Sequence, residues 1–407
     1  MKMFLKICVI FSMLLISRSA FAATAKQVKP LPPPFEISGW IPYWRSATGT
    51  AEALAHASVF TELSPFGYTV KHDGTIFDAL KLDQDPWPQF IQTARADGIK
   101  LIPTVMWSNA EDMDAVLRSA TSRKAHIASI VSEVKARGWD GVDIDYEAKK
   151  SETKIYFSRF LKELKASLGS KKILSCTIEA RTPLDSRYTT PPKTIEYAND
   201  YAAIGTYCDR VRIMAYDQGT IDLKLNKTAV GPYVPVADPA WVEKVIRLAM
   251  KSIPKKKIVL GVATYGYEYT VTPVVGGGYV YDRETAFNQN YATGIAAAFG
   301  LSPTRTKTGE MALVYIPTST PLVAHSLAGT SAVPSQDTSS FGVSTVTSST
   351  GTTTLQTAAS LPFRLLWWSD AGAISDKIAL AKRLGLRGVA LFKLDGGADP
   401  LLWNILK

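Results

Sequence analysis

Short apolar runs alternate with amphipathic segments along most of the chain. The apolar runs have the length of strands, and eight are found, at residues 37–44, 57–63, 100–106, 141–147, 172–180, 210–217, 257–267 and 388–394. Between them hydrophobic residues recur at i, i+3, i+4 and i+7, the period of a helix that buries one face, as in 127–134 before Gly138. Eight strands that alternate with helices predict a parallel (β/α)8 TIM barrel of the α/β class, and a doubly wound open sheet is the alternative.

The alternation fails between the seventh and eighth strands. Residues 268–366 contain three consecutive glycines, and the stretch 331–360 holds 16 Ser or Thr with Asp337 as its only charge. Such a composition favours strands and loops over helix. We therefore expect a β-rich insertion subdomain at 268–366, with the barrel formed by 37–267 and 367–407. A Ser/Thr-rich linker is the alternative.

The first 22 residues differ from the rest of the chain. Two lysines precede the apolar run 7–16, and the small-residue sequence Ala20-Phe21-Ala22 follows it. This pattern is typical of a cleaved signal peptide, cut near Ala22–Ala23, on a protein that is secreted, periplasmic or associated with the cell wall. An uncleaved membrane anchor is the alternative, but the run is shorter than the ~20 residues that a membrane-spanning helix needs. The proline-rich residues 23–36 form the expected spacer.

Composition and charge limit the partners of the chain. Of its 407 residues 46% are hydrophobic and 20% are charged, which are ordinary globular values and exclude wholesale disorder. The net charge of +10 falls to +7 once the three positive residues Lys2, Lys6 and Arg18 leave with the signal peptide. A basic surface suits anionic surroundings such as a cell wall, but the positive residues form no long run, so we expect no nucleic-acid partner. We expect a monomer without a stable membrane anchor.

Cysteine and histidine are too few to form an obvious site. Cys8 lies in the signal segment, which leaves Cys176 and Cys208. One disulfide bridge is an open alternative, and two buried free thiols are the interpretation that we prefer. We expect no metal site and no cofactor, because the four histidines stand far apart without the spacing of metal ligands: His56, His72, His126 and His325.

The most informative segment is Trp139–Glu147, with the sequence WDGVDIDYE. Side chains alternate along a strand, so Asp143, Asp145 and Glu147 share one face. Three neighbouring carboxylates cannot all be ionised without cost, so at least one should hold a proton near neutral pH. Glu147 stands at the carboxyl end of the strand, where barrel active sites lie, and a raised pKa there suits a general acid. A solvated sheet edge or a metal site is the alternative.

The sequence DGVDIDYE resembles the D-x-x-D-x-D-x-E signature of glycoside hydrolase family 18, which includes chitinases and N-acetylglucosaminidases. Met-Ala-Tyr-Asp at 214–217 is similar to the family's M-x-Y-D motif, and 265–267, 367–370 and 388–391 look like the bacterial branch that hydrolyses spore-cortex or other peptidoglycan glycans. The resemblance implies an enzyme that cleaves β-1,4-linked glycans containing N-acetylglucosamine, with peptidoglycan as first substrate and chitin or chito-oligosaccharide as second. A non-catalytic carbohydrate-binding lectin on the same barrel is the alternative.

The resemblance also implies substrate-assisted retaining catalysis, in which the substrate's 2-acetamido group replaces an enzymic nucleophile. Glu147 would protonate the glycosidic oxygen. Asp145 would orient and stabilise the acetamido group, and Asp143 would support Asp145 and share its proton. Tyr216 would donate a hydrogen bond to the acetamido oxygen. Asp140 has the opposite parity in the strand, so we expect it to be structural.

Further residues are expected to bind the substrate. Asp217 and Met214 belong to the M-x-Y-D motif, and Phe392 stands where family members commonly place a tryptophan under the cleaved sugar. Phenylalanine offers a smaller apolar face, so affinity or sugar preference should differ. If Phe392 is a core residue, Trp367 or Trp368 would take its place. Aromatic residues at the ends of the first three strands are also candidates for stacking on sugars, with a core position as the alternative: Trp40, Tyr43, Trp44, Phe66, Tyr68 and Trp107.

Overall fold

The computed structural model describes residues 35–317 and 361–407. The expected signal peptide, nearly all of the expected spacer and the Ser/Thr-rich stretch 331–360 lie outside the described residues, so these remain predictions. In the described part of the chain no helix is long and apolar enough to cross a membrane.

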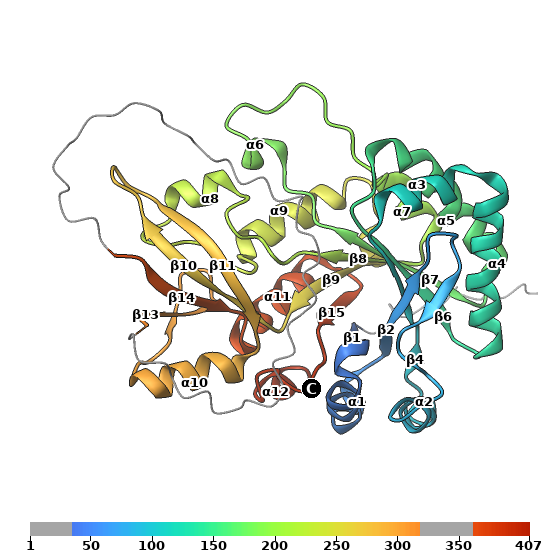
Figure 1. Cartoon of the computed structure of the whole chain (residues 1–407), viewed down its shortest axis with the longest axis horizontal. Helices are drawn as coiled ribbons and strands as arrows, with labels where there is room; N and C mark the ends of the chain where they lie inside the picture. Colours follow the sequence, from blue (N-terminus) through green and yellow to red (C-terminus); the bar gives the residue numbers. More distant parts are fainter. Residues whose placement is uncertain (1–34, 318–360) are drawn as a thin grey trace, which may run out of the picture. The chain divides into compact units, whose positions relative to one another are not determined.

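Within the described residues eight strands form a closed parallel barrel (Figure 1), as the alternation predicts. The ring closes because β1 pairs in parallel with both β15 and β2, which excludes the open doubly wound sheet. A short strand, β3 (Ile76–Asp78), adds to β2 in the antiparallel sense. The barrel strands are β1 (Glu36–Pro42), β2 (Glu62–Val70), β4 (Lys100–Leu101) continued by β5 (Thr104–Trp107), β6 (Gly141–Tyr146), β7 (Ile173–Glu179), β8 (Arg210–Met214), β9 (Ile258–Ala263) and β15 (Gly388–Phe392).

Helices cover the outside of the barrel, because their apolar stripes pack on the strands. In α4 (Ala120–Ala136) the buried apolar positions 127, 130, 131 and 134 follow the helical period, and the Ser119 side chain caps the first turn. The other helices of the barrel are α1 (Ser46–Ala55), α2 (Trp87–Ala96), α3 (Ala110–Arg118), α5 (Lys154–Leu168), α6 (Leu184–Arg187), α7 (Tyr201–Tyr207), α8 (Leu223–Thr228), α9 (Pro239–Ala249), α11 (Ala371–Leu384) and α12 (Leu402–Ile405).

The second barrel strand lies later in the chain than its pattern predicts. The pattern predicts a strand at 57–63, whereas 57–59 form a 3-10 turn and β2 begins at Glu62. Ser64 and Pro65 make this strand hard to recognise in the sequence, because both residue types have low strand propensity. The barrel tolerates them, since they pair with β1 and most side chains of β2 are buried on both faces.

A second, antiparallel sheet lies between β9 and β15 in the chain, which confirms the β-rich insertion. Its order is β11-β10-β14-β13-β12, and α10 (Gln289–Phe299) packs on it through Ala292 and Ala296. Figure 1 shows this sheet, called sheet B below, on the side of the barrel away from α3, α4 and α5. Its strands are β10 (Gly266–Pro273), β11 (Tyr279–Phe287), β12 (Thr304–Arg305), β13 (Met311–Tyr315) and β14 (Phe363–Trp368).

Cys176 and Cys208 form a disulfide, so the preferred interpretation of two free thiols is wrong. Cys176 lies in β7, Cys208 stands just before β8, and both are fully buried. These two strands pair in parallel with Cys176 opposite Val211, which brings the sulfur atoms together. The cysteines are 32 residues apart in the chain, and a count of two carries no information on their distance in space.

Candidate active site

The acidic row of β6 points into the barrel and runs to its carboxyl end. Asp143 and Asp145 are 0% and 4% exposed, and the alternation of the strand places the apolar residues between them on the outer face. Glu147 follows β6, and its backbone N–H donates to the carbonyl of Trp107 at 2.8 Å. The three carboxyl groups therefore lead from the barrel interior to its mouth, where Glu147 is partly exposed.

Asp143 is held by donors from four other strands. Arg212 of β8 lies 3.3 Å from its Oδ2 and also pairs with Glu62 of β2. The remaining donors are Trp40 Nε1 at 3.2 Å, Thr104 Oγ1 at 2.9 Å and Thr177 Oγ1 at 2.9 Å. A buried carboxylate needs such compensation, because an unpaired charge in the interior is strongly destabilising. Asp143 is thus fixed beneath Asp145 as the base of the row.

Burial and repulsion raise the pKa values of the upper two carboxyl groups. The pKa of Asp145 lies well above its usual range because of burial and the charges of Glu147 and Asp143. Its Oδ1 is buried without a hydrogen-bond partner among the described residues. Burial, followed by the charge of Glu179, raises the pKa of Glu147 to about 7 against the opposing effect of Lys149. Glu147 can therefore hold or release a proton near neutral pH, as a general acid must.

Glu179 and Lys149 flank Glu147, and neither stands out in the sequence as a site residue. Glu179 ends β7, and its carboxylate accepts a hydrogen bond from Asn199 Nδ2 at 2.6 Å. Lys149 Nζ lies 3.6 Å from the same carboxylate, and the Lys149 side chain is almost fully buried. A signal for Glu179 exists in the sequence, because it stands two residues after Thr177 on the inward face of a predicted strand.

The M-x-Y-D motif places a tyrosine beside the acidic row. Tyr216 is buried, and its hydroxyl has no hydrogen-bond partner in the described part of the chain. Burial, followed by the charges of Asp217, Asp145 and Glu147, raises the pKa of Tyr216 well above its usual value. The hydroxyl therefore stays protonated and is available to donate a hydrogen bond. Met214 ends β8 opposite Glu179 and is partly buried at the same mouth.

Asp217 is tied to the start of sheet B. Its Oδ1 accepts hydrogen bonds from the Tyr265 hydroxyl at 2.7 Å and the Tyr267 hydroxyl at 2.8 Å. Its φ of +57° is a left-handed conformation that is uncommon outside glycine and clusters at functional sites. Burial raises the pKa of Asp217, while the two hydrogen bonds and Arg283 oppose the rise. The motif at 265–267 carries a family resemblance in the sequence but gives no indication of this contact.

Phe392 ends β15 at the same mouth, beside Tyr216. The two rings are stacked with centroids 5.8 Å apart, and the Phe392 side chain remains partly exposed. Trp367 and Trp368 are buried in sheet B, so they are not placed to support a sugar. Three further rings meet Phe392 edge-on: Trp40 at 5.8 Å, Phe66 at 5.9 Å and Tyr265 at 6.2 Å.

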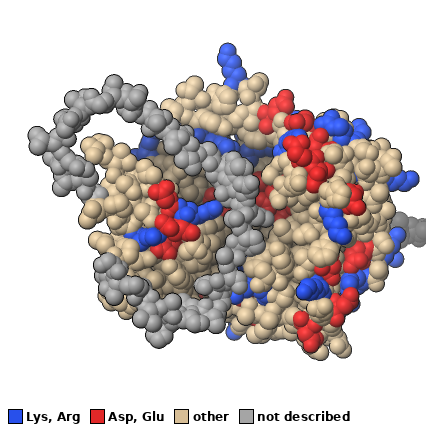
Figure 2. Space-filling model, viewed as in Figure 1, with Lys and Arg blue, Asp and Glu red and all other residues tan. Residues whose placement is uncertain are grey.

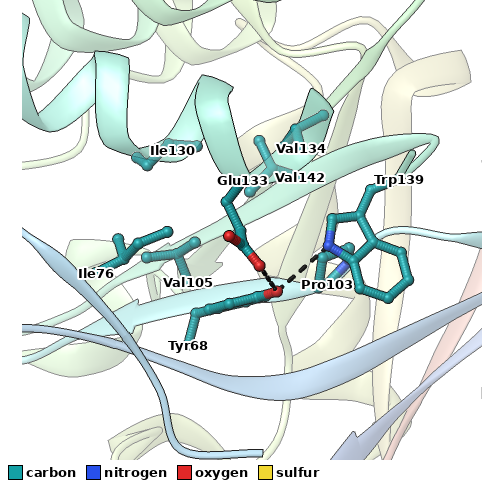
Figure 3. A pocket seen from close by; sticks show the side chains of 9 residues that line it. All are labelled: Tyr68, Ile76, Pro103, Val105, Ile130, Glu133, Val134, Trp139 and Val142. Atoms are coloured by element: carbon teal, nitrogen blue, oxygen red, sulfur yellow. Dashed lines mark hydrogen bonds between the residues drawn. The ribbon is translucent and has the colours of Figure 1, made fainter. Parts of the chain in front are cut away.

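Three predicted substrate-binding residues are buried, one inside the barrel and two on the outer face of its wall. Trp40 is 1% exposed inside the barrel, where its indole N–H donates a hydrogen bond to Asp143. Tyr68 lies behind the barrel wall, beside a small cavity, and its hydroxyl donates to Glu133 at 2.7 Å (Figure 3). Trp107 packs against Tyr146 on the same outer face. Their interpretation as sugar-stacking residues does not fit the structure, because the strands turn the last two outward. Partly exposed rings remain after β1, at Tyr43 and Trp44.

The mouth gathers proton donors around one partly exposed acid. Glu147 supplies an exchangeable proton. The carboxyl group of Asp145 and the hydroxyl of Tyr216 can form hydrogen bonds with a polar group beside it. Among the described residues no group of three or more His, Cys, Asp or Glu side chains could hold a metal ion. The arrangement suits cleavage of a bond whose leaving oxygen needs a proton while a neighbouring polar group is held in place.

The chain is similar in sequence and in fold to known bacterial enzymes. The chain is 27% identical over 220 residues to the cortical fragment-lytic enzyme of Bacillus cereus, covering 51% of this chain and 46% of that protein. It spans about half the length of the curated relatives that it matches. The spore cortex-lytic enzyme SleL of Bacillus cereus matches in structure with a TM-score of 0.65 at 20% identity, covering 91% of this chain and 73% of that chain.

The same fold also occurs in a protein described as a chitinase-like agglutinin. The chitinase-like agglutinin RobpsCRA of Robinia pseudoacacia matches with a TM-score of 0.61 at 16% identity, covering 91% of this chain and 98% of that chain. At these identities the two structures show a shared fold. The family model of glycosyl hydrolases family 18 matches residues 40–397, a range that includes the acidic row and the M-x-Y-D motif. Because this range is most of the chain, the chain belongs to glycosyl hydrolases family 18.

Proposed function

We propose that the protein hydrolyses β-1,4 bonds in glycans that contain N-acetylglucosamine, with assistance from the substrate's own acetamido group. The observation that carries the proposal is the inward-facing row of carboxyl groups that ends at the partly exposed Glu147, where burial raises the pKa to about 7. A carboxyl group with this pKa is a competent proton donor at neutral pH. Asp145 and Tyr216 support the proposal, because both lie close enough to Glu147 for its charge to help raise their pKa values.

The proposed reaction has two steps. Glu147 gives its proton to the glycosidic oxygen as the bond to the anomeric carbon breaks, and the leaving sugar departs as an alcohol. The acetamido carbonyl oxygen bonds to that carbon and forms an oxazolinium ion, while Asp145 bonds the acetamido N–H and Tyr216 donates to the oxygen. Water, deprotonated by Glu147, then attacks the anomeric carbon and opens the ring with retained configuration.

Peptidoglycan is the first proposed substrate, and chitin or chito-oligosaccharide is the second. The similarity to a cortical fragment-lytic enzyme and the basic chain support an anionic wall glycan. Purified peptidoglycan and chitin are digested separately, and the products are analysed by mass spectrometry. Fragments ending in N-acetylglucosamine from peptidoglycan support the proposal. Fragments from chitin alone would reverse the order of substrates, and no fragments from either glycan would overturn the proposed hydrolysis.

A carbohydrate-binding lectin on the same barrel is the second candidate, favoured by the match to the Robinia agglutinin. Glu147→Gln separates the two functions, because it removes the proton and keeps the shape of the side chain. A hydrolase should lose about 10²–10⁴-fold in turnover and still bind the glycan. A wild-type protein that binds glycan and releases no product would establish the lectin instead.

We propose that the chain is exported as a monomer and cleaved near Ala22–Ala23. The Cys176–Cys208 disulfide supports export, because such bridges persist in oxidising compartments. Amino-terminal sequencing of the protein from its native cells should begin at Ala23, and light scattering should give the mass of one chain. A protein that retains Met1 in the cytoplasm would contradict the proposed export.

A further inference from the structure

A row of tyrosines leads away from the acidic mouth along sheet B. Tyr265 stands just before β10, and Tyr267 and Tyr269 follow it on one face of the strand. Neighbouring rings lie 5.6 Å and 6.2 Å apart, centroid to centroid. Since the first two tyrosines donate to Asp217, this face of sheet B is continuous with the candidate active site.

Arg283 lies on the same face of sheet B. It stands in β11 directly opposite Tyr269, and its guanidinium carbon lies 5.0 Å from the centre of the Tyr267 ring. The side chain is exposed, and within the described residues it has no ion pair and no hydrogen bond. A guanidinium placed over a ring keeps its N–H groups free for a planar anion. Arg283 is therefore held in place and left with unused donors.

The opposite face of sheet B gives a contrast. Arg364 of β14 pairs there with Glu284 at 2.8 Å, so its charge is already compensated. On the face that Figure 2 shows, the described Lys and Arg side chains are interspersed with Asp and Glu. Arg283 has no such ion pair among the described residues, so its guanidinium is the group on the tyrosine face that could recognise an anion.

Two carboxylates of the described chain, Asp217 and Glu310, act on the same tyrosines as Arg283, and Glu310 is already bonded, for example by Trp367 Nε1 at 2.9 Å. The charges of Asp217 and Arg283 both act on Tyr267 and Tyr269. Asp217 already accepts hydrogen bonds from two tyrosine hydroxyls, and the N–H groups of Arg283 make no hydrogen bond to it. The guanidinium therefore lies over the tyrosine row with capacity for one further carboxylate.

We propose that Arg283 binds a carboxylate of the glycan next to the cleaved sugar, so that the enzyme prefers acidic glycans to neutral ones. The inference rests on the proposed hydrolase function and names its substrate class more closely. In peptidoglycan the sugar beside N-acetylglucosamine bears a lactyl group. Its carboxylate is free in peptide-free glycan, and in peptide-bearing glycan the stem peptide supplies carboxylates of its own.

The test compares four substrates with the full-length protein. They are a peptide-free oligosaccharide of alternating N-acetylglucosamine and N-acetylmuramic acid, its lactyl methyl ester, the peptide-bearing oligosaccharide, and a chito-oligosaccharide. The variants are Arg283→Met and Arg283→Lys. Arg159→Met is the matched control, since Arg159 is also exposed, makes no hydrogen bond or ion pair with the described residues and lies on α5, away from sheet B. Thermal unfolding is measured for each variant.

The readout is the ratio of kcat/KM for the free acid to kcat/KM for its ester. Arg283→Met should lower this ratio about 5–30-fold, between the values of an exposed ion pair and a bidentate one, and Arg283→Lys should lower it less. The effect should shrink at high ionic strength. The control variant should keep the wild-type ratio. A loss confined to the peptide-bearing glycan would also support the proposal and assign the carboxylate to the stem peptide.

Two results distinguish a failure of the Arg283 proposal from a failure of the proposed hydrolase function. If Arg283→Met lowers kcat/KM equally for acid, ester and chito-oligosaccharide, Arg283 acts through Asp217 and the proposal is overturned while hydrolysis stands. If the wild-type protein cleaves none of the four glycans, the proposed function itself fails and the inference fails with it.

Discussion

At the scale of single residues, Glu147 should set the pH dependence of the reaction. Its pKa is about 7, against an ordinary value of 4.5, because burial and Glu179 disfavour the charged form. The protonated, active acid therefore predominates below pH 7 and is lost as the pH rises through that value. We expect kcat/KM to fall about tenfold per pH unit above 7. A profile from pH 5 to 9 that stays flat above 7 would assign the proton to another group.

Tyr216→Phe separates catalysis from stability. The hydroxyl has no hydrogen-bond partner among the described residues, so its removal should leave the melting temperature unchanged or slightly higher. If the hydroxyl donates to the acetamido oxygen as charge develops there, kcat should fall about 10²–10³-fold. The two quantities are measured on the same purified variant. A full loss of turnover with a large fall in melting temperature would make Tyr216 a structural residue.

Substitution of Phe392 tests whether the cleaved sugar stacks on its ring. Its half-exposed ring is stacked on Tyr216, so Phe392→Ala should raise KM and lower kcat together, by about 1–3 kcal/mol in kcat/KM. Phe392→Trp should be tolerated. Kinetics per folded molecule decide the question, with the folded fraction measured by circular dichroism. An Ala variant that is unstable but kinetically normal would show a packing role only.

At the scale of secondary-structure elements, the Cys176–Cys208 disulfide joins the adjacent strands β7 and β8. It closes a loop of moderate length, so the double variant Cys176→Ser, Cys208→Ser should lose about 2–4 kcal/mol of unfolding free energy. Urea unfolding of the wild type with and without a reductant gives the comparison. Equal midpoints in the two conditions would show that the bridge contributes no stability or is absent in solution.

Elements that follow one clear period could be predicted from the sequence, and contacts between strands that are distant in the sequence could not. The alternation in β6 predicts the acidic row, and the period of 3.6 predicts α4. The pattern places the second strand too early in the chain, because Pro65 is unfavourable in most central strands. The pairing of Arg212 with Asp143 crosses from β8 to β6, and no local pattern reports such a contact.

At the scale of the whole molecule, the candidate site draws on two separate parts of the chain. The barrel supplies the carboxyl row and Tyr216, and sheet B supplies the tyrosines that hold Asp217. The family resemblance could predict the barrel and the residues of its two motifs, because these are contiguous in sequence. The contacts that Glu179, Tyr265 and Arg283 make could not be predicted, since they form only where distant segments meet.

The product of a single turnover tests the central claim most directly. A peptidoglycan or chitin oligosaccharide is cleaved in an NMR tube, alongside the same oligosaccharide after de-N-acetylation, and the anomeric protons are followed. Catalysis by the acetamido group predicts that the first product appears as the β-anomer and that the deacetylated glycan is not cleaved. An initial α-anomer, or equal cleavage rates for the two glycans, would contradict the account.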